Sequence, residues 1–463
     1  MVVVRGVLEL ASKQKTRKRS LKKLKGETFS ALDVVRPSIS AESSTERPST
    51  TFLMEEVLER GNMQLALKQV MSNKGCPGWD GMRVDELADY LRGHWPEIRS
   101  QLELGKYRPS LVRRATIPKA NGGERKLGIP TVVDRLIQQA LQQVLSRIFD
   151  PTFSERSFGF RPGRSCHQAI DVAQQEIRSG RKVVVDIDLD SFFDRVNHDR
   201  LMHRLSKEIR DKRVLRLIGL YLRSGILDQG LITIPDKGTP QGGPLSPLLS
   251  NVVLDELDKE LEQRGHRFPR PTHRNIYVRT ERAGKRVMSG VKQFIERKLK
   301  LKVNELKSAV APPRERKFLG FTLREADGKV NVSDEAITRF KDRVRELTRR
   351  QHRDLRNQVS ILSRYLQGWI GYYGRSEADH VIKSLDQWVR RRLRVLHLKR
   401  WRTPRTRYRE FERLGMKRRD CKFISHTTKR YWYLSGTRAI NFTLNLRYFR
   451  DLGLYFMLDR YAL

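Results

Sequence analysis

Acidic residues interrupt an apolar run that otherwise has the pattern of a buried strand, and this feature constrains the fold most. The run spans Lys182–Leu189. An Asp in a buried strand is costly unless it is paired or binds a metal. Because side chains two residues apart in a strand share a face, Asp186 and Asp188 point the same way, and Asp190 continues the row. Carboxylates suit a hard cation such as Mg²⁺. The other interpretation is that these acids cap a helix that begins near Ser191.

The pattern around this strand predicts an α+β core followed by helices. Apolar residues over 133–148 recur every three or four positions, which is typical of an amphipathic helix. Ile276–Val278 predicts a second short strand, and the helical period returns from Ser333 onward. Residues 1–52 are basic and then rich in Ser, Thr and Pro, so we expect a disordered extension there.

The charge of the chain points to a polyanionic partner. Lys and Arg number 94 against 53 Asp and Glu, which gives a formal net charge of +41. A globular protein with this charge repels itself unless it works against a polyanion, and nucleic acid is the obvious one. Hydrophobic residues make up 38% of the chain, which is enough to build a core. No apolar run approaches the roughly 18 residues of a membrane span. The three cysteines form no Cys-x-x-Cys pair, which argues against a zinc ribbon and fits a reducing compartment.

The acidic strand is part of a longer motif, Val-Asp-Ile-Asp188-Leu-Asp-Ser-Phe-Phe193-Asp. It resembles the first palm motif of reverse transcriptases. Further motifs stand in the order found in the reverse transcriptases of bacterial group II introns. These are Ile117–Pro130, Phe158–Ser165, Gly238–Pro247, a segment with Lys307, Phe318–Phe321 and Leu366–Tyr373. The chain is thus similar to this family from about Phe52 to its end.

The resemblance implies a fold and a set of partners. The implied fold is an α+β right-hand polymerase, with fingers and an antiparallel palm sheet, followed by an all-α thumb or maturase (X) domain. The expected parts are the extension at 1–52, fingers at 53–180, palm at 181–325 and thumb at 326–463. The implied activities are RNA-directed DNA synthesis and maturase (splicing) activity in the bacterial cytoplasm. The implied partners are group II intron RNA, an RNA template and a DNA primer, with no membrane. The chain ends without the cysteine pairs or His-rich cluster of an appended endonuclease, so it resembles the endonuclease-lacking members.

The resemblance also assigns site residues. Asp188 would be catalytic and would hold Mg²⁺, assisted by the carbonyl of Leu189. Phe193 would lie under the sugar and exclude a 2′-hydroxyl. The implied nucleotide-binding set is Lys119, Arg125, Phe193, Gln241 and Lys307. For each cation the alternative is a plain phosphate contact on a basic face.

One family motif is missing. The remaining catalytic carboxylates normally come as Tyr-Ala-Asp-Asp, but Phe268–Arg274 holds that place, and no Asp or Glu lies between Glu262 and Glu281. Two-metal phosphoryl transfer needs carboxylates from both motifs. We expect Arg270 and Arg274 to put positive charge at the metal site, and Mg²⁺ binding and polymerase activity to be impaired around Pro271–Arg274. True loss, deliberate change and sequence error are alternative origins.

The C-terminal region predicts an RNA-binding surface. Residues 391–450 hold 19 Lys or Arg against three acids, with Trp and Tyr interleaved. Cations and aromatics together suit structured RNA. The predicted RNA contacts are Arg391, Arg392, Arg394, Lys399, Arg400, Trp401 and Arg405. RNA binding needs no palm metals, so a non-polymerising splicing cofactor is the alternative to a polymerase with maturase function. A retron-like reverse transcriptase is a third reading.

Overall fold

The computed structural model describes residues 50–118, 123–228, 230–239, 242–271, 274–349 and 354–461. These residues form two compact units that divide at Pro312 and Pro313. The expected extension at 1–52 lies outside the described residues as far as residue 49. The expected boundary near residue 325 differs from this division, because the contacts group the segment from Pro313 onward with the C-terminal helices.

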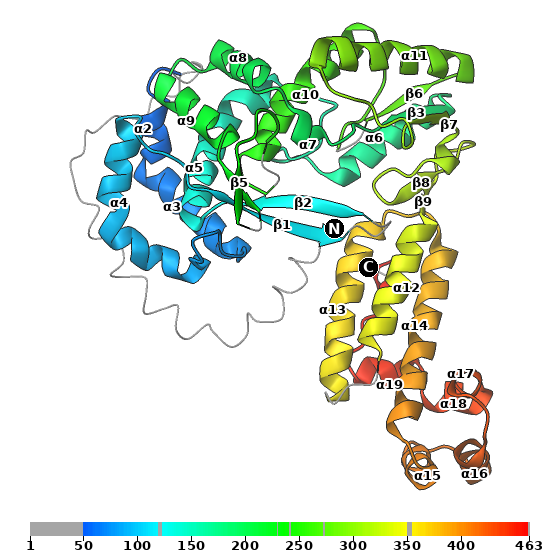
Figure 1. The fold of residues 1–463 in the computed structure, drawn as a ribbon. Helices are drawn as coiled ribbons and strands as arrows, with labels where there is room; N and C mark the ends of the chain where they lie inside the picture. The colour runs from blue at the N-terminus through cyan, green and yellow to red at the C-terminus, as the bar shows by residue number, and fades with distance from the viewer. Residues whose placement is uncertain are drawn as a thin grey trace, which may run out of the picture. The chain divides into compact units, whose positions relative to one another are not determined.

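The N-terminal unit contains many helices and two sheets (Figure 1). Its α-helices are α2 Leu53–Leu58, α3 Arg60–Asn73, α4 Leu87–Glu103, α5 Val132–Phe149, α6 Cys166–Arg178, α7 Phe192–Arg195, α8 His198–Glu208, α9 Lys212–Leu222, α10 Ser246–Gln263 and α11 Glu281–Phe294. Its short turns of helix are η2 Val84–Glu86, η3 Asp150–Thr152 and η4 Ile295–Leu299. Its strands are β1 Val112–Pro118, β2 Glu124–Ile129, β3 Val183–Ile187, β4 Ile226–Asp228, β5 Leu231–Thr233, β6 Arg274–Val278 and β7 Ala309–Ala311.

Helix α5 is the centre of the larger core of this unit. Its apolar stripe confirms the helix predicted over 133–148, and Leu136, Ala140, Leu141 and Val144 are buried against α2, α3 and α10. The Thr131 side chain accepts a hydrogen bond from the Asp134 amide and so caps the start of the helix. The buried residues of this larger core come from helices and loops.

A three-stranded antiparallel sheet carries the acidic motif, in the order β6-β3-β7. Its strand β3 confirms the predicted buried strand, and β6 confirms and extends the one predicted at Ile276–Val278. Helix α11 packs along one face of this sheet (Figure 1). A Cβ on Gly284 would lie 2.5 Å from a methyl group of Val310, so glycine permits this close approach. This sheet is the antiparallel palm sheet that the resemblance implied.

A second sheet of the N-terminal unit has the order β2-β1-β4-β5. Strands β1 and β2 form an antiparallel ribbon, in which Thr116 pairs with Lys126 and Ile117 with Arg125. Strand β4 joins β1 in parallel, and β5 pairs antiparallel with β4. The ribbon places alternate side chains of the predicted finger motif on opposite faces.

The C-terminal unit is mostly helical, as expected for a thumb or maturase domain. It begins with η5 Pro313–Glu315 and the hairpin β8 Phe321–Leu323 and β9 Val330–Val332. Its remaining elements are α12 Asp334–Leu347, α13 Leu355–Tyr373, α14 Asp379–Arg400, α15 Pro404–Arg413, α16 Arg418–His426, α17 Tyr431–Leu434, α18 Arg438–Thr443, α19 Leu446–Asp451 and η6 Met457–Tyr461. Helices α12, α13 and α14 lie side by side as a bundle around Phe340, Leu362 and Leu393 (Figure 1).

Candidate functional site

The acidic face of β3 is opposite the face on which α10 and α11 pack. Val185 and Ile187 pack into the core with Leu257 of α10, so Asp186 and Asp188 point to the other side and are half-buried. Asp186 pairs across the sheet with Asn275 of β6. With the Asn275 amide oriented to satisfy its neighbours, its nitrogen donates to Asp186 Oδ1 at 3.2 Å. This hydrogen bond from the buried Asn275 amide therefore offsets the cost of partly burying the Asp186 carboxylate.

Asp188 lies where β3 leaves the sheet, next to the segment before β7. Its amide donates to Ser308 Oγ at 3.0 Å, and its carbonyl accepts from the Asn304 amide at 2.8 Å. Lys307 Nζ is 3.5 Å from Asp188 Oδ2. Asp188 and Lys307, predicted from separate motifs, are thus brought together by the fold. Leu189 forms an isolated bridge with Val303 next to them.

Asp190 is hydrogen-bonded to residues other than Asp186 and Asp188. Its carboxylate accepts a hydrogen bond from Arg195 Nη2 at 2.8 Å, and its amide donates to the Lys302 carbonyl at 2.8 Å. Ser191, in a left-handed conformation with φ 46°, is the N-cap residue of α7, and its side chain makes no cap hydrogen bond. The N-cap position is thus held by Ser191 and not by one of the strand acids.

The two arginines of the altered motif do not point toward Asp188, and the expectation that they charge the metal site is wrong. Arg270 is ion-paired with Asp258 of α10, and Arg270 Nη1 donates to Asn251 Oδ1 at 2.9 Å. Arg274 Nε lies 3.6 Å from Asp258 Oδ1. The reason is the register of the sheet, which places Arg274 opposite Ile187, on the face covered by α10. His273 lies outside the described residues.

The same register decides which side chains of β6 face Asp186 and Asp188, and so whether two metal ions fit between the strands. Strand β6 presents Asn275 to Asp186, and none of its five residues is acidic. In the described ranges no three His, Cys, Asp or Glu side chains come together as a metal site. Asp188 and the Leu189 carbonyl are hard oxygen donors, yet the other wall of a two-metal site has no carboxylate. The residues present do not fit two-metal catalysis.

A pocket of about 360 Å³ lies beside Phe193, between the β1–β2 ribbon and the segment before Gln241. Its lining includes Arg114, Lys126 and Lys237, together with Phe193 and Gly238. Gly238 has φ +96°, and a Cβ there would lie 2.9 Å from the Phe193 carbonyl. The Thr239 amide donates to that carbonyl at 2.6 Å. An aromatic ring and three cations, against the single acid Asp194, suit a ligand with a ring and phosphates.

The β1–β2 ribbon places its cations on two opposite faces. Lys126 lines the Phe193 pocket with Arg114, because alternate residues of the antiparallel pair share a face. Arg125 is exposed and lies on the other face of β2, paired with Ile117. Lys119 and Gln241 lie outside the described residues, so their predicted roles stay predictions. Sequence reasoning passed over Lys126 and Arg114, whose alternation with Arg125 along β1 and β2 was the available signal.

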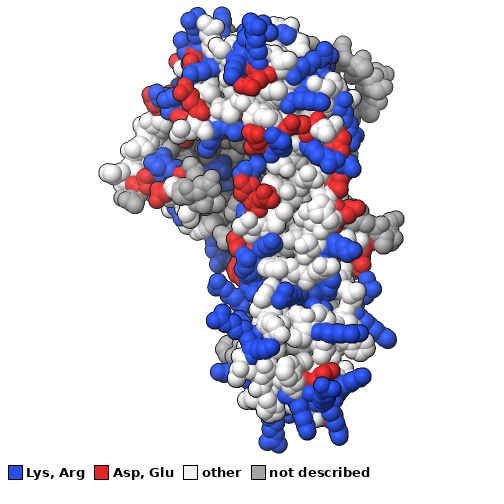
Figure 2. Space-filling view, turned by 90° about the vertical axis from the view of Figure 1, so that its right-hand side faces the viewer, with Lys and Arg blue, Asp and Glu red and all other residues white. Residues whose placement is uncertain are grey.

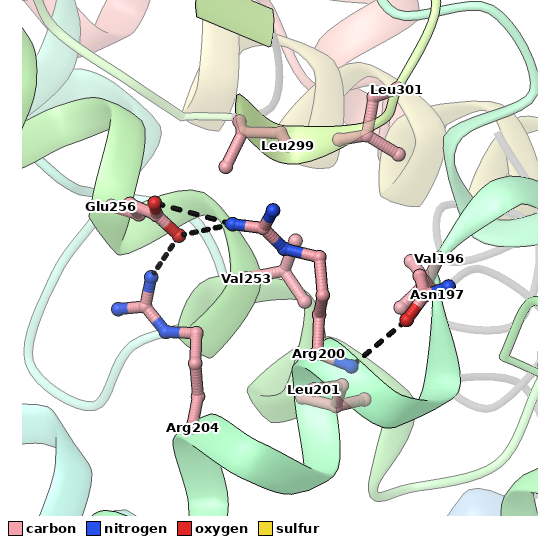
Figure 3. A pocket seen from close by; sticks show the side chains of 9 residues that line it. All are labelled: Val196, Asn197, Arg200, Leu201, Arg204, Val253, Glu256, Leu299 and Leu301. Atoms are coloured by element: carbon pink, nitrogen blue, oxygen red, sulfur yellow. Dashed lines mark hydrogen bonds and ion pairs between the residues drawn. The ribbon is translucent and has the colours of Figure 1, made fainter. Parts of the chain in front are cut away.

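A second depression in the N-terminal unit is too small for a ligand (Figure 3). It holds about 10 Å³, and its apolar wall includes Val253 and Leu301. Arg204 Nη1 donates to Glu256 Oε2 at 2.8 Å, and Arg200 approaches the same carboxylate at 3.4 Å. These ion pairs fasten α8 to α10 and leave room for about one water molecule.

In the C-terminal unit the fold joins two of the predicted motifs. Gly320 follows Leu319, and both have positive φ, at +83° and +55°. Tyr372 Oη donates to the Leu319 carbonyl at 2.9 Å. The ring centroid of Tyr373 lies 5.1 Å from that of Phe321. The Phe318–Phe321 turn is therefore held by the Gly-Tyr-Tyr end of α13.

The predicted RNA contacts differ widely in exposure. Lys399 and Arg405 are exposed. Arg394 is buried, and its Nε donates to the Leu444 carbonyl at 3.0 Å, while burial lowers its pKa to about 10. Trp401 packs on Phe411, with ring centroids 5.0 Å apart.

The other three predicted contacts are half-buried and have protein partners. Arg391 Nη2 donates to the Trp432 carbonyl at 3.0 Å, Arg392 Nε to Thr348 Oγ1 at 3.2 Å and Arg400 Nη2 to Gln358 Oε1 at 3.1 Å. Their roles in RNA binding stay predictions. Lys and Arg cover much of the lower part of the molecule in Figure 2, where this unit lies.

Two family models and several known proteins match parts of this chain. The family model for reverse transcriptase (RNA-dependent DNA polymerase) matches residues 117–323, and that for the group II intron maturase-specific domain matches residues 337–415. Protein YkfC of Escherichia coli is 38% identical over 43% of this chain and 54% of its own length. The group II intron-encoded protein LtrA of Lactococcus lactis subsp. cremoris is 36% identical over 49% of this chain and 38% of its own.

The chain therefore spans about half or less of the length of these curated relatives. A chain of a solved partial Cas6-RT-Cas1–Cas2 complex is 24% identical over 53% of this chain and 42% of its own, with a TM-score of 0.35. No described helix is long and apolar enough to cross a membrane. The two matched models, in this order, cover most of the motifs described above. The chain belongs to the family of group II intron reverse transcriptases and maturases.

Proposed function

We propose that this chain binds group II intron RNA and assists its splicing, and that it does not carry out efficient RNA-directed DNA synthesis. The observation that carries the second part is the pairing of β3 with β6. Asn275 stands across from Asp186, and no acid follows on β6. Asp188 alone does not hold two cations about 4 Å apart, so Mg²⁺ binding is impaired.

The maturase part of the proposal is supported by the basic C-terminal unit. Exposed Lys399 and Arg405 lie near the junction of α14 and α15, within a region that has 19 cations and three acids. Phosphate neutralisation by such cations gives salt-sensitive affinity for RNA and requires no palm metal. In this proposal residues 53–180 are fingers, 181–325 palm and 326–463 thumb or maturase domain, and the protein acts with nucleic acid in the cytoplasm.

Primer extension tests the polymerase part. Purified protein is incubated with primed RNA, dNTPs and either Mg²⁺ or Mn²⁺, and Asp188→Asn is run in parallel. We expect no template-dependent product above that of the variant. Robust extension that Asp188→Asn abolishes would overturn the proposed loss.

A splicing assay tests the maturase part. The substrate is a precursor RNA that contains the intron flanking the coding gene, at a Mg²⁺ concentration where it splices slowly alone. We expect the protein to raise the splicing rate and Lys399→Ala with Arg405→Ala to reduce that gain. An unchanged rate with the wild-type chain contradicts this function.

The Phe193 pocket favours a second function, which is nucleotide binding without polymerisation. It keeps a ring and three cations although the carboxylates of the second motif are missing. An RNA template and a DNA primer would then bind without turnover.

A further inference from the structure

Two neighbouring aromatic side chains on α17 face solvent within the basic region 391–450. In residues 391–450 Trp and Tyr alternate with cations. In the structure some of these rings are packed and others are exposed. Tyr408 and Trp401 pack against the core of the C-terminal unit. Trp432 is 40% exposed and Tyr433 is 54% exposed. This pair lies C-terminal to the residues matched by either family model.

The orientation of α17 explains why these rings point outward. Leu434 is fully buried, and Tyr431, three residues earlier on the same helical face, packs on the same core. Trp432 and Tyr433 therefore take the opposite side of this single turn. Ser435 Oγ and Arg391 Nη2 both donate to the Trp432 carbonyl, at 2.7 and 3.0 Å. The backbone beneath the two rings is thus fixed.

Each ring also carries a cation on or near its face. The guanidinium carbon of Arg391 lies 4.2 Å from the centroid of the Trp432 ring. Lys429 Nζ lies 4.4 Å from the centroid of the Tyr433 ring. Between Asp420 and Asp451 the sequence contains no Asp or Glu. The local field therefore favours a polyanion, while the rings offer surfaces on which flat groups stack.

We propose that Trp432 and Tyr433 form a stacking platform for unpaired bases of the RNA, with Arg391 and Lys429 neutralising the adjacent phosphates. This inference rests on the proposed RNA-binding function and deepens it, because it names unpaired nucleotides as the recognised class. Stacking on aromatic rings is tolerant of base identity. The platform thus distinguishes looped RNA from paired RNA and reads no sequence.

Stacking and phosphate contact respond differently to salt, so a salt titration distinguishes them. Loss of a phosphate contact reduces the slope of log affinity against log salt, whereas loss of stacking leaves that slope unchanged. Fluorescence anisotropy is measured with the full chain, an RNA hairpin with about eight unpaired loop nucleotides, and a fully paired RNA of equal length.

Trp432→Leu and Tyr433→Leu keep apolar bulk but remove the rings. We expect the double variant to bind the hairpin about five- to hundredfold more weakly, to bind the duplex as the wild type does, and to keep the salt slope. A variant with Phe in place of Trp432 and with Tyr433 unchanged (Trp432→Phe) should keep most of the wild-type affinity, because it keeps a ring at this position. Trp79→Leu in the N-terminal unit is the matched control, since Trp79 is 47% exposed, and it should change nothing.

Two outcomes overturn the proposal. One is equal weakening for hairpin and duplex, and the other is an unchanged affinity of the double variant. If Lys399→Ala still weakens hairpin binding while the double variant does not, the platform fails and RNA binding stands. If the wild-type chain binds neither RNA, both proposals fail.

Discussion

Arg270 and Asp258 form an ion pair in which neither side chain reaches solvent, with 2% and 0% of their surfaces exposed. The pair ties the segment before β6 to α10. The Arg270 carbonyl also accepts from the Phe158 amide at 2.9 Å, so the same residue holds the predicted Phe158–Ser165 motif. The altered motif is thus a packed structural element, which explains how the fold persists without the carboxylates of the family.

Replacing Asp258 should destabilise the N-terminal unit strongly. Arg274 shares this carboxylate, and burial lowers the pKa of Arg274 to about 10 even with Asp258 present. Asp258→Asn leaves two buried guanidinium groups without an anion, and we expect a loss of about 3–5 kcal/mol in the free energy of unfolding. Urea denaturation followed by circular dichroism measures it.

The control for this change is Glu281→Gln. Glu281 pairs with Lys285 on α11, and both side chains are more than 60% exposed. Solvent screens an exposed pair, so its loss should change stability little. A similar loss for both variants would contradict the structural role of Asp258.

Acid should destabilise the C-terminal unit through His397. This side chain is buried among Trp401, Tyr448 and Phe449, and burial lowers its pKa from 6.5 to about 3. The unfolded chain therefore binds a proton that the folded chain does not, between pH 6.5 and 3. Stability is complete above pH 6.5 and falls as the pH drops through this window, by about 2 kcal/mol at pH 5.

Urea midpoints at pH 7 and pH 5 check this prediction. His397→Gln should lose less stability between the two values than the wild type loses. His426→Gln changes an exposed histidine of the same unit and should behave like the wild type. An identical fall for wild type and His397→Gln would contradict the assignment.

Periodicity and motif order predicted the strand at Lys182–Leu189 and the helix over 133–148. The motifs named Asp188 and Lys307 separately, and only the fold shows that they meet. Periodicity and motif order failed at Arg270, because the partner that turns it inward is Asp258 on a preceding helix, and pairing between elements leaves no local signal. The same limit applies to Trp401 and Trp432. Both stand in the same basic aromatic region, yet Trp401 follows the end of α14 and packs on Phe411, whereas the helix phase of α17 exposes Trp432.

Glycine is required at position 320. The backbone there has φ +83°, and a Cβ would lie 2.7 Å from Tyr373 Oη. Gly320→Ala should therefore cost about 1–3 kcal/mol and loosen the turn from the end of α13. Gly371→Ala is the control, because Gly371 is helical, exposed and has no atom within 4 Å of its ideal Cβ. It should be neutral or slightly stabilising. Thermal unfolding of both variants decides, and equal midpoints would count against the requirement.

Nucleotide binding should depend on Lys126 more than on Arg125. Lys126 lines the pocket beside Phe193, whereas Arg125 projects from the other face of β2. Loss of one charged contact to a triphosphate weakens binding by about tenfold. We therefore expect Lys126→Ala to weaken a fluorescent dNTP by about that factor and Arg125→Ala to change it much less, in an equilibrium titration without primer. The two variants remove one charge each from adjacent positions of the same strand, so they share any nonspecific electrostatic effect. A larger loss with Arg125→Ala would place the triphosphate on the opposite face of the ribbon and restore the role that the family resemblance implied for Arg125.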